Sequence, residues 1–273
     1  YWDGYQLVDG TAFFPYPNVY RCPFELKNGQ SEEAAYIDAL NQSELFNEEV
    51  AAVIIEPVLG EGGYVPAPKA FLKALGLRCK EKGIYLILDE IQSGIGRTGT
   101  WFSYQQAGVS PDFVLTAKGL GSGVPVGACL AKRSIMDQWP KGAHGGTYGG
   151  NPIACAAVNA TLEVIQGTLP AIDALSTCAK ELLTTALKDH PLVGDIRVNG
   201  LMIGIEFVTN KESKAPNSEA MLSVMRACLE KGLIVLSSGV HNNVIRLAPP
   251  LIIEQDLLKK GLNTLCEVIH DTH

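Results

Sequence analysis

A single lysine stands where an apolar, strand-like run gives way to a glycine-rich loop. Lys118 closes the run 113–118 (FVLTAK) and is followed by Gly119, Gly121 and Gly123. In a phosphate-binding P-loop the glycines precede the lysine, so this order does not fit that motif. A lysine in a partly dry pocket loses affinity for its proton and can attack a carbonyl carbon to form a Schiff base. Lys118 is therefore a candidate nucleophile.

Acidic side chains end two further strand-like runs. Glu56 lies near the end of the run 51–57, and Asp89 and Glu90 lie near the end of the run 85–91. Ligands of open α/β sheets bind beyond the carboxyl ends of the strands. Because a charge buried without a partner is costly, three strands that end in charged groups favour a binding site. The alternative is that each group is a paired core charge or the first polar residue of a loop.

Asp89 and Lys118 together suggest a specific cofactor. An aspartate can hold the protonated nitrogen of a pyridine ring while a lysine forms a Schiff base with its aldehyde, which makes pyridoxal phosphate an electron sink. The glycines beside Lys118 would let a flat ring lie against the backbone. The competing interpretation is a plain ion pair between Lys118 and Asp89, which would not need those glycines.

Residues 94–99 (GIGRTG) match the glycine pattern of a dinucleotide-binding loop. Such a loop needs a helix that begins at its third glycine and an acidic residue about 20 positions further on, at the end of the next strand. Residues 100–112 have no helical face, and the next strand ends in Lys118 instead of an acid. We therefore expect a turn at 94–99 and no dinucleotide site.

A sheet and its helices must position these groups. Apolar runs separated by helical segments predict an α/β domain with a mostly parallel sheet; the strands are expected at 51–57, 85–91, 113–118 and 126–132, and the helices at 32–48 and 68–82. Residues 151–190 have a helical pattern. A smaller α+β domain is expected to follow, with strands at 196–207, 233–238 and 244–250 and helices at 220–232 and 254–269. We expect a large domain over residues 1–160, a linking helical segment over 161–190 and a small domain over 191–273.

The composition excludes several classes of function. A net charge of -7 with scattered acids argues against a nucleic-acid partner, and no apolar run approaches the ~20 residues of a membrane span. The seven cysteines lie singly, which predicts reduced thiols in a cytoplasmic compartment. The five histidines lack the spacing of metal ligands, so we expect no metal site.

Four ordered strings carry a family resemblance: IIEPVLGEGG, LILDEIQSGIGRTG, PDFVLTAKGLGSGVPVGA and HGGTYGGNPIACAA. From about Glu48 to its C-terminus, the chain resembles the class-III (ω-amino acid) aminotransferases, which are pyridoxal-phosphate enzymes of fold type I. It is most similar to the 4-aminobutyrate aminotransferase-like group, which also contains amino-acid racemases. The resemblance implies a large cofactor-binding α/β domain with a mostly parallel sheet and a small C-terminal α+β domain.

The resemblance implies roles for the residues around the cofactor. Lys118 would form the Schiff base with pyridoxal 5'-phosphate and then move the proton between the substrate Cα and the cofactor. Asp89 would hold the pyridinium nitrogen, Gln92 would hydrogen-bond the phenolic oxygen, and Ile91 would pack on one face of the ring. Thr147, in GGTYGGNP, would bind the phosphate of a neighbouring subunit, so that a homodimer is needed for a complete site.

The resemblance also implies how a substrate is bound. Arg246, in VIRLAPP, would clamp a substrate carboxylate with its guanidinium fork. Glu61, in GEGG, would pair with that arginine when the substrate carries no α-carboxylate, so one pocket would accept two kinds of substrate. Glu56 would have an orienting role beneath the site.

The implied function is the transfer of an amino group from an ω- or α-amino acid, of the 4-aminobutyrate or ornithine type, to a 2-oxo acid. The alternatives are an amino-acid racemase or epimerase on the same scaffold, and an inactive truncated fragment. The opening stretch, residues 1–20, is typical of a loop. Residues 1–47 contain neither the phosphate loop nor the stacking aromatic that family members carry before this point. We therefore expect an incomplete large domain with exposed sheet surface, and weak activity or none from this chain alone.

Overall fold

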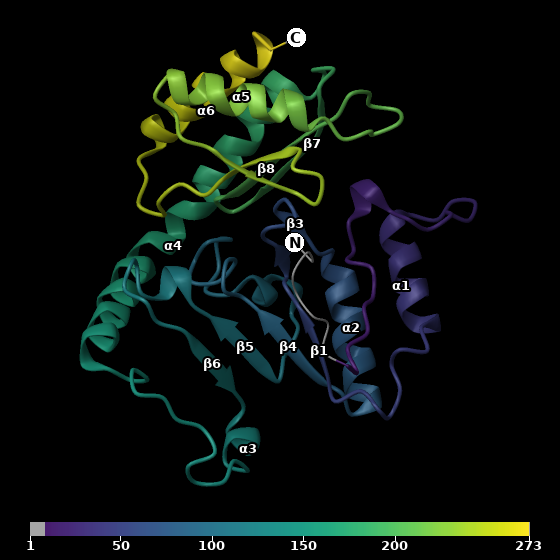
Figure 1. The fold of residues 1–273 in the computed structure, drawn as a ribbon, viewed down its shortest axis with the longest axis vertical. Coiled ribbons are helices and arrows are strands. Elements are labelled where there is room, and N and C mark those ends of the chain that lie inside the picture. The colour runs from purple at the N-terminus through teal and green to yellow at the C-terminus, as the bar shows by residue number, and fades with distance from the viewer. Residues whose placement is uncertain (1–8, 273) are drawn as a thin grey trace.

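Two main sheets and one long helix between them make up the fold (Figure 1). The computed structural model describes residues 9–272. The first eight positions of the loop expected over residues 1–20 therefore lie outside the described residues. Its described part contains the 3₁₀ turn η1 (Val19–Arg21).

The first sheet carries the candidate residues at its carboxyl edge. Its strand order is β1 (Ala52–Ile55), β4 (Tyr85–Asp89), β5 (Phe113–Thr116) and β6 (Ala128–Ala131). β1, β4 and β5 are parallel, and β6 is antiparallel to β5. The mostly parallel sheet is therefore confirmed, and the carboxyl ends of β1, β4 and β5 lie along one edge.

Helix α2 (Lys69–Lys82) covers one face of this sheet. Its apolar stripe includes Phe71 and Leu75, which pack in one core cluster with Leu86 and Leu88 of β4. The helix ends at Gly83, whose φ of 70° is the left-handed conformation that closes many helices.

Helix α1 (Glu32–Gln42) packs on α2. It begins at Ser31, whose hydroxyl oxygen accepts a hydrogen bond from the Ala34 N–H. The expected range of 32–48 is too long, because the backbone becomes extended at Ser43 (φ -70°, ψ 126°).

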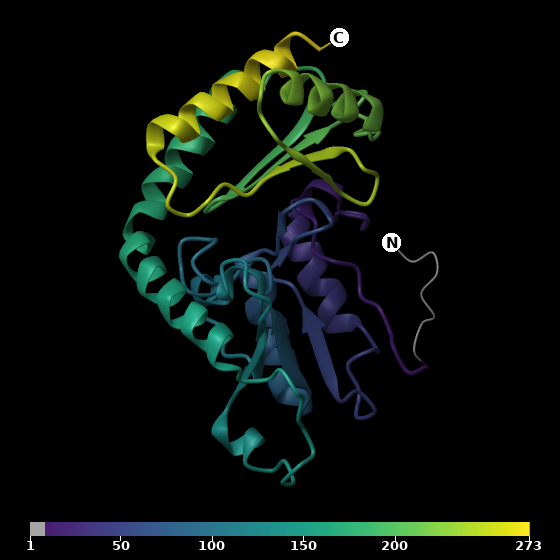
Figure 2. The same ribbon diagram turned by 60° about the vertical axis from the view of Figure 1, so that its left-hand side comes forward.

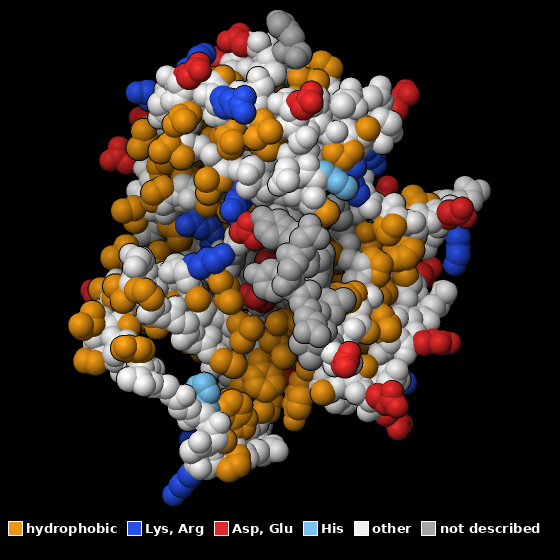
Figure 3. Space-filling model, viewed as in Figure 1, with side chains coloured by type: hydrophobic (Ala, Val, Ile, Leu, Met, Phe, Trp, Pro, Cys, Tyr) orange, Lys and Arg blue, Asp and Glu red, His pale blue; other side chains and the backbone are white. Residues whose placement is uncertain are grey.

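The opposite face of the first sheet presents apolar side chains to solvent. Ile54 and Tyr85, on neighbouring strands, are 60% and 42% exposed. Figure 3 shows hydrophobic side chains gathered over this sheet. Parallel sheets are normally covered on both faces. In the described chain one face of this sheet is left exposed, as the sequence predicts.

The second sheet is antiparallel, in the order β7 (Val193–Asn199), β8 (Met202–Phe207), β10 (Val244–Leu247) and β9 (Leu236–Ser238). The single strand expected over 196–207 is wrong, because the chain turns at Gly200 (φ 59°) and β7 and β8 pair as a hairpin. α5 (Ser218–Glu230) and α6 (Gln255–His270) pack on this sheet (Figure 1), and β8 is buried along its whole length. This is the expected small α+β arrangement.

Helix α4 (Pro152–Leu187) runs from the first sheet to the second (Figure 2). The Asn151 side chain caps its start by accepting a hydrogen bond from the Ala154 N–H at 2.9 Å. The helix continues through Pro170, so most of the helical stretch expected at 151–190 is one element. Its C-terminal half packs against β7 and α6 through residues at helical spacing: Ile172, Leu175, Ala179, Leu183 and Leu187.

Short elements complete the described chain. β2 (Val58–Leu59) and β3 (Val65–Pro66) form a hairpin around residues 60–64. η2 (Ser103–Ala107), η3 (Lys118–Leu120) and α3 (Arg133–Met136) lie in the connections of the first sheet. In this part of the chain no helix begins at Gly99, which agrees with the turn expected at 94–99.

Residues 9–272 contain neither a membrane-spanning helix nor a cluster of metal ligands. None of the helices there is long and apolar enough to cross a membrane. Nor does that range contain a group of three or more His, Cys, Asp or Glu residues that could hold a metal ion.

Candidate active site

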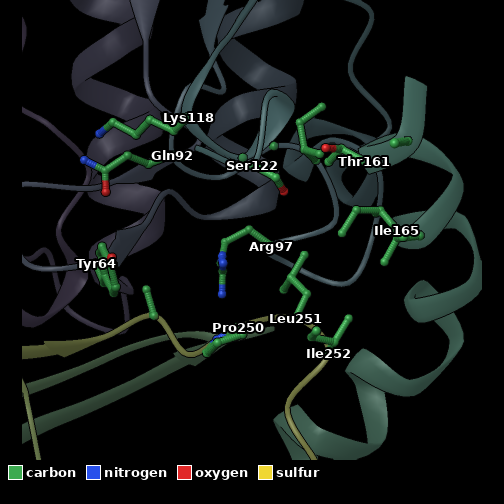
Figure 4. A pocket seen from close by; sticks show the side chains of 16 residues that line it. Tyr64, Gln92, Arg97, Lys118, Ser122, Thr161, Ile165, Pro250, Leu251 and Ile252 are labelled. Atoms are coloured by element: carbon green, nitrogen blue, oxygen red, sulfur yellow. The ribbon is translucent and has the colours of Figure 1, made fainter. Parts of the chain in front are cut away.

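A cavity of about 540 Å³ lies where the first sheet, α4 and the chain after β10 meet. Lys118, Gln92, Tyr64 and Arg97 line it from the first sheet and its loops. Apolar residues of α4 and of the segment after β10, among them Ile165 and the run 250–252, line the other side (Figure 4). The cavity therefore has a charged end and an apolar end.

Lys118 occupies a special backbone position at the end of β5. It is the first residue of η3 and has a φ of 43°, which is uncommon for a residue with a side chain. Figure 4 shows the side chains of Lys118 and Gln92 extending in the same direction. The chain thus holds the lysine at the cavity wall through an unfavourable local conformation, a feature that clusters at functional sites.

Asp89 and Glu56 lie near Lys118 at the carboxyl ends of β4 and β1. Asp89 is the register partner of Leu115 on β5, and its Oδ1 accepts a hydrogen bond from the Ile91 N–H at 3.0 Å. Burial raises the pKa of Glu56, and the negative charge of Asp89 raises it further. The hydrogen bond from the Gly60 N–H and the positive charge of Lys118 lower the pKa by less, so the net shift is upward. Glu56, Asp89 and Lys118 therefore lie close enough for their charges to affect one another.

Glu61 and Arg246 form an ion pair between the two sheets. Arg246 Nη1, from β10, donates to Glu61 Oε1 at 2.6 Å, and the same oxygen accepts from Gln92 Nε2 at 2.8 Å. Burial alone would raise the pKa of Glu61, but the hydrogen bonds from Arg246 and Gln92 outweigh it and lower that pKa. The Arg246 guanidinium also lies 5.9 Å from the centre of the Tyr64 ring.

Of the predicted site residues, Lys118 and Gln92 line the cavity and the others do not. Ile91 is half-buried in the turn that follows β4. Thr147 is exposed on the loop between α3 and α4 and does not line the cavity. Their roles stay predictions.

Arg97 and Tyr64 are among the cavity residues that the sequence did not single out. Arg97 belongs to the glycine-rich turn at 94–99, and its Nη1 donates to the Pro249 carbonyl oxygen at 2.5 Å. Burial lowers the pKa of Arg97. Tyr64 has a φ of 54° and follows the pair Gly62-Gly63. In both cases the available signal was a side chain beside glycines in a loop at the carboxyl edge of the sheet.

Comparison with curated proteins finds similar chains among amino-acid enzymes. A 5-aminovalerate aminotransferase of Pseudomonas putida is 42% identical over 88% of this chain and 57% of its own length. A leucine/methionine racemase of Thermococcus litoralis is 38% identical over 97% of the chain and 60% of its own length. A 4-aminobutyrate aminotransferase of Escherichia coli is 38% identical over 97% and 62%. The chain thus spans about 60% of the length of these relatives.

Solved structures give the same picture. An aminotransferase of Bacillus anthracis is 36% identical with a TM-score of 0.82, over 93% of this chain and 60% of its own. An amine transaminase from an uncultivated Pseudomonas species, solved in its PLP-bound form, is 29% identical with a TM-score of 0.90, over 100% and 64%. The model of the family Aminotransferase class-III matches residues 6–269. With its fold and its sequence both accounted for over nearly the whole length, the chain belongs to the class-III aminotransferases.

Proposed function

We propose that the chain carries the chemistry of a pyridoxal-phosphate-dependent aminotransferase, which moves an amino group from an ω- or α-amino acid to a 2-oxo acid. The observation that carries the proposal is the placement of Lys118 and Asp89 at the carboxyl ends of adjacent parallel strands. The Glu61–Arg246 ion pair is joined to the same cavity through Gln92.

The residues present fit the cofactor. Within the described chain, the Asp89 carboxylate accepts one hydrogen bond, at Oδ1, which leaves Oδ2 available to a ring N–H. Gly60 leaves room for Gln92, since a Cβ there would lie 2.6 Å from the Gln92 amide carbon. Pyridoxal phosphate, when bound, supplies an electron sink that favours removal of the proton from the substrate Cα.

Each residue then has a defined task. Lys118 would hold the cofactor as a Schiff base through Nζ, and the same amine would accept and return the proton at the substrate Cα. The negative charge of Asp89 would favour the protonated form of the ring nitrogen. Gln92 would donate to the phenolic oxygen, Ile91 would cover one ring face, and Glu56 would help to orient these groups.

Arg246 and Glu61 would sort substrates by their carboxylates. A substrate with an α-carboxylate would take the guanidinium of Arg246 and displace Glu61. A substrate whose reacting carbon carries no carboxylate would leave the ion pair closed, so that Arg246 is never buried without a partner. An ion pair that can open or stay closed supports both ω- and α-amino acids as substrates.

The wider setting is also proposed. Thr147, on its exposed loop, would bind the cofactor phosphate of a second subunit, which requires a homodimer. The seven cysteines are free thiols in the structure, which supports a reducing, cytoplasmic compartment.

Racemisation is the second candidate function. It is favoured by the 38% identity to a leucine/methionine racemase over 97% of the chain. Both reactions would need Lys118 and Asp89, so the two residues do not separate them. Incubation of one enantiomer of an amino acid without any 2-oxo acid discriminates, because only a racemase would then produce the other enantiomer.

A half-reaction tests the proposed transfer. The chain is loaded with pyridoxal phosphate and mixed with 4-aminobutyrate or ornithine, and the visible absorbance of the cofactor is followed. We expect the donor to bleach the absorbance slowly, since the chain spans about 60% of the length of its relatives, 2-oxoglutarate to restore it, and Lys118→Ala to show neither change. A loaded chain whose absorbance no amino donor alters would contradict the proposal.

A further inference from the structure

The loop that carries Glu61 (residues 60–64, the Glu61 loop) lies on the second sheet although it belongs to the β2–β3 hairpin. The Gly239 N–H, just after β9, donates to the Glu61 carbonyl oxygen at 2.9 Å. Arg197 Nε, from β7, donates to the Gly63 carbonyl oxygen at 3.0 Å. The backbone of the loop is therefore held at two points, independently of the Glu61 side chain.

Arg197, Gly204 and Arg246 form a row across the second sheet. Gly204 on β8 is the register partner of Arg197 on one side and of Arg246 on the other. Register partners present their side chains on the same face, so the two guanidinium groups flank Gly204. A Cβ at Gly204 would lie 2.7 Å from the Gly63 carbonyl oxygen, which means that the loop occupies the space of the missing side chain.

Buried charges fix the orientation of Arg197. Its side chain is 6% exposed, and Nη1 lies 2.9 Å from Asp195 Oδ2 and 2.6 Å from Glu206 Oε2. Glu206 also accepts a hydrogen bond from Arg21 Nε at 2.5 Å. Nη1 serves the two carboxylates and Nε serves the loop, so the contacts are spread over two nitrogens. A lysine ammonium carries its three N–H donors on one nitrogen and does not reproduce this spread.

We propose that Arg197 is a positioning residue: by holding Gly63 over Gly204, it keeps the Glu61 carboxylate within reach of Gln92 and Arg246. Because the loop backbone is anchored, breaking the ion pair needs only the Glu61 side chain to move. A loosened anchor gives Glu61 further positions away from Arg246, so a carboxylate ligand competes better for the guanidinium. The consequence for substrates rests on the proposed function, whereas the anchoring itself does not.

The first test measures hydrogen–deuterium exchange on the full chain for Arg197→Met, Arg197→Lys and Gly204→Ala. Gly204→Ala displaces the loop from the other side while leaving the Arg197–Glu206 ion pair in place. We expect the amides of Gly63, Tyr64 and Gly239 to exchange on the order of tenfold faster in all three variants. Arg226→Met, an exposed arginine on α5, is the matched control and should exchange like the unsubstituted chain.

Two exchange results would overturn the anchoring. One is unchanged exchange in the Glu61 loop of both Arg197→Met and Gly204→Ala. The other is faster exchange spread evenly along the β7–β8 ladder in every variant, which is the sign of a merely structural role. Arg197→Lys is the sharpest case, because it keeps a cation beside Glu206 and should loosen the loop without loosening the ladder.

The second test titrates the same variants with acetate, a minimal carboxylate, by calorimetry. We expect tighter binding to Arg197→Met and Gly204→Ala, in the same direction as for Glu61→Gln, which removes the Glu61 charge from Arg246 directly. Tighter binding to Glu61→Gln alone would contradict the coupling through Arg197. If the loop exchanges faster but acetate affinity is unchanged in all variants, the anchoring stands and the proposed carboxylate role of Arg246 fails.

Discussion

Glu61 is the residue at which the two sides of the site meet. One oxygen, Oε1, accepts hydrogen bonds from Arg246 on the second sheet and from Gln92 after β4. Any ligand that takes Arg246 from Glu61 therefore also changes the surroundings of Gln92, the residue expected beside the cofactor oxygen. The proposed substrate binding at Arg246 and the proposed cofactor contact of Gln92 would therefore be linked through a single carboxylate.

The charge of Asp89 is the feature that would make the cofactor effective. Asp89→Asn keeps the size of the side chain and its hydrogen bond to the Ile91 N–H but removes the charge that holds a ring nitrogen protonated. We expect the half-reaction to slow by about 10²–10³-fold, while the covalent adduct at Lys118 still forms. Stopped-flow absorbance measures the rate, and an unaltered rate would contradict the role of Asp89.

Glu206 makes the stability of the second sheet sensitive to acid. Burial alone would raise its pKa, but the charges of Arg197 and Arg21 outweigh burial and hold the pKa below its ordinary value of 4.5. The folded chain thus holds the proton less tightly than the unfolded chain does. The stabilisation is complete above the unfolded pKa and is lost as the pH falls through the folded pKa.

The variant Glu206→Gln tests this dependence. At neutral pH it should lower the free energy of unfolding by about 3–5 kcal/mol, since the buried Arg197 and the partly exposed Arg21 lose the carboxylate that they share. Below pH 4.5, the loss of stability with acid should be shallower than in the unsubstituted chain. Urea unfolding at several pH values measures both, with the exposed Glu230→Gln on α5 as control; parallel pH curves for all three proteins would refute the assignment.

Among the elements, β1 has one side on the exposed face of the first sheet and the other side on the core cluster beneath α2. Ile54 points to the solvent-exposed face, whereas Val53 packs against the cluster under α2. Ile54→Lys should change the free energy of unfolding by no more than about 0.5 kcal/mol and should reduce self-association. Val53→Lys should cost about 2 kcal/mol or more, because it brings a charge into the core.

Urea unfolding and light scattering on these two variants check the prediction. Equal destabilisation by both lysines would mean that the face carrying Ile54 is covered in solution. If neither lysine lowers the free energy of unfolding, the core cluster beneath α2 does not need an apolar side chain at position 53.

Element types were more predictable from the sequence than were element connections. The apolar runs at 51–57, 85–91 and 113–118 each became a strand, because a short continuous apolar run is a clear strand signal even where one face stays exposed. The run 196–207 became two strands, since apolar residues on both sides of Asn199-Gly200 hid a turn that this dipeptide favours. The passage of α4 through Pro170 depends on packing against the second sheet, which local propensity does not contain.

The site was predictable in its residues and not in its contacts. Lys118, Asp89, Gln92, Glu61 and Arg246 stand in motifs, so their types and order were visible. The sharing of Glu61 between Gln92 and Arg246 and the anchoring of its loop by Arg197 join residues more than 30 positions apart. Such contacts follow from how the two sheets face each other, which no local pattern encodes.

At the scale of the whole molecule, the chain spans about 60% of the length of its relatives and leaves one sheet face exposed. The proposed dimer adds a further requirement, since each site would draw Thr147 from the other subunit. In the proposed dimer, the cavity around Lys118 is one part of a site that a second subunit helps to form.

A mixing experiment tests this requirement. Lys118→Ala removes the amine and Thr147→Val removes the hydroxyl, so each variant alone should lack tight cofactor sites. In mixed dimers one site has both residues intact, so titration with pyridoxal phosphate should find tight sites at about a quarter of the unsubstituted number. A mixture of Lys118→Ala with the double variant should gain none, and an absence of gain in the first mixture would mean that Thr147 does not serve a partner.

The proposed function requires the amine at position 118 to hold pyridoxal phosphate beside Asp89. To check this, the full chain is loaded with pyridoxal phosphate and reduced with borohydride, and the modified lysine is located by peptide mass spectrometry. We expect one dominant adduct, on Lys118, that is absent from Lys118→Ala. An adduct spread equally over exposed lysines such as Lys73 and Lys80, with none favoured at Lys118, would contradict it.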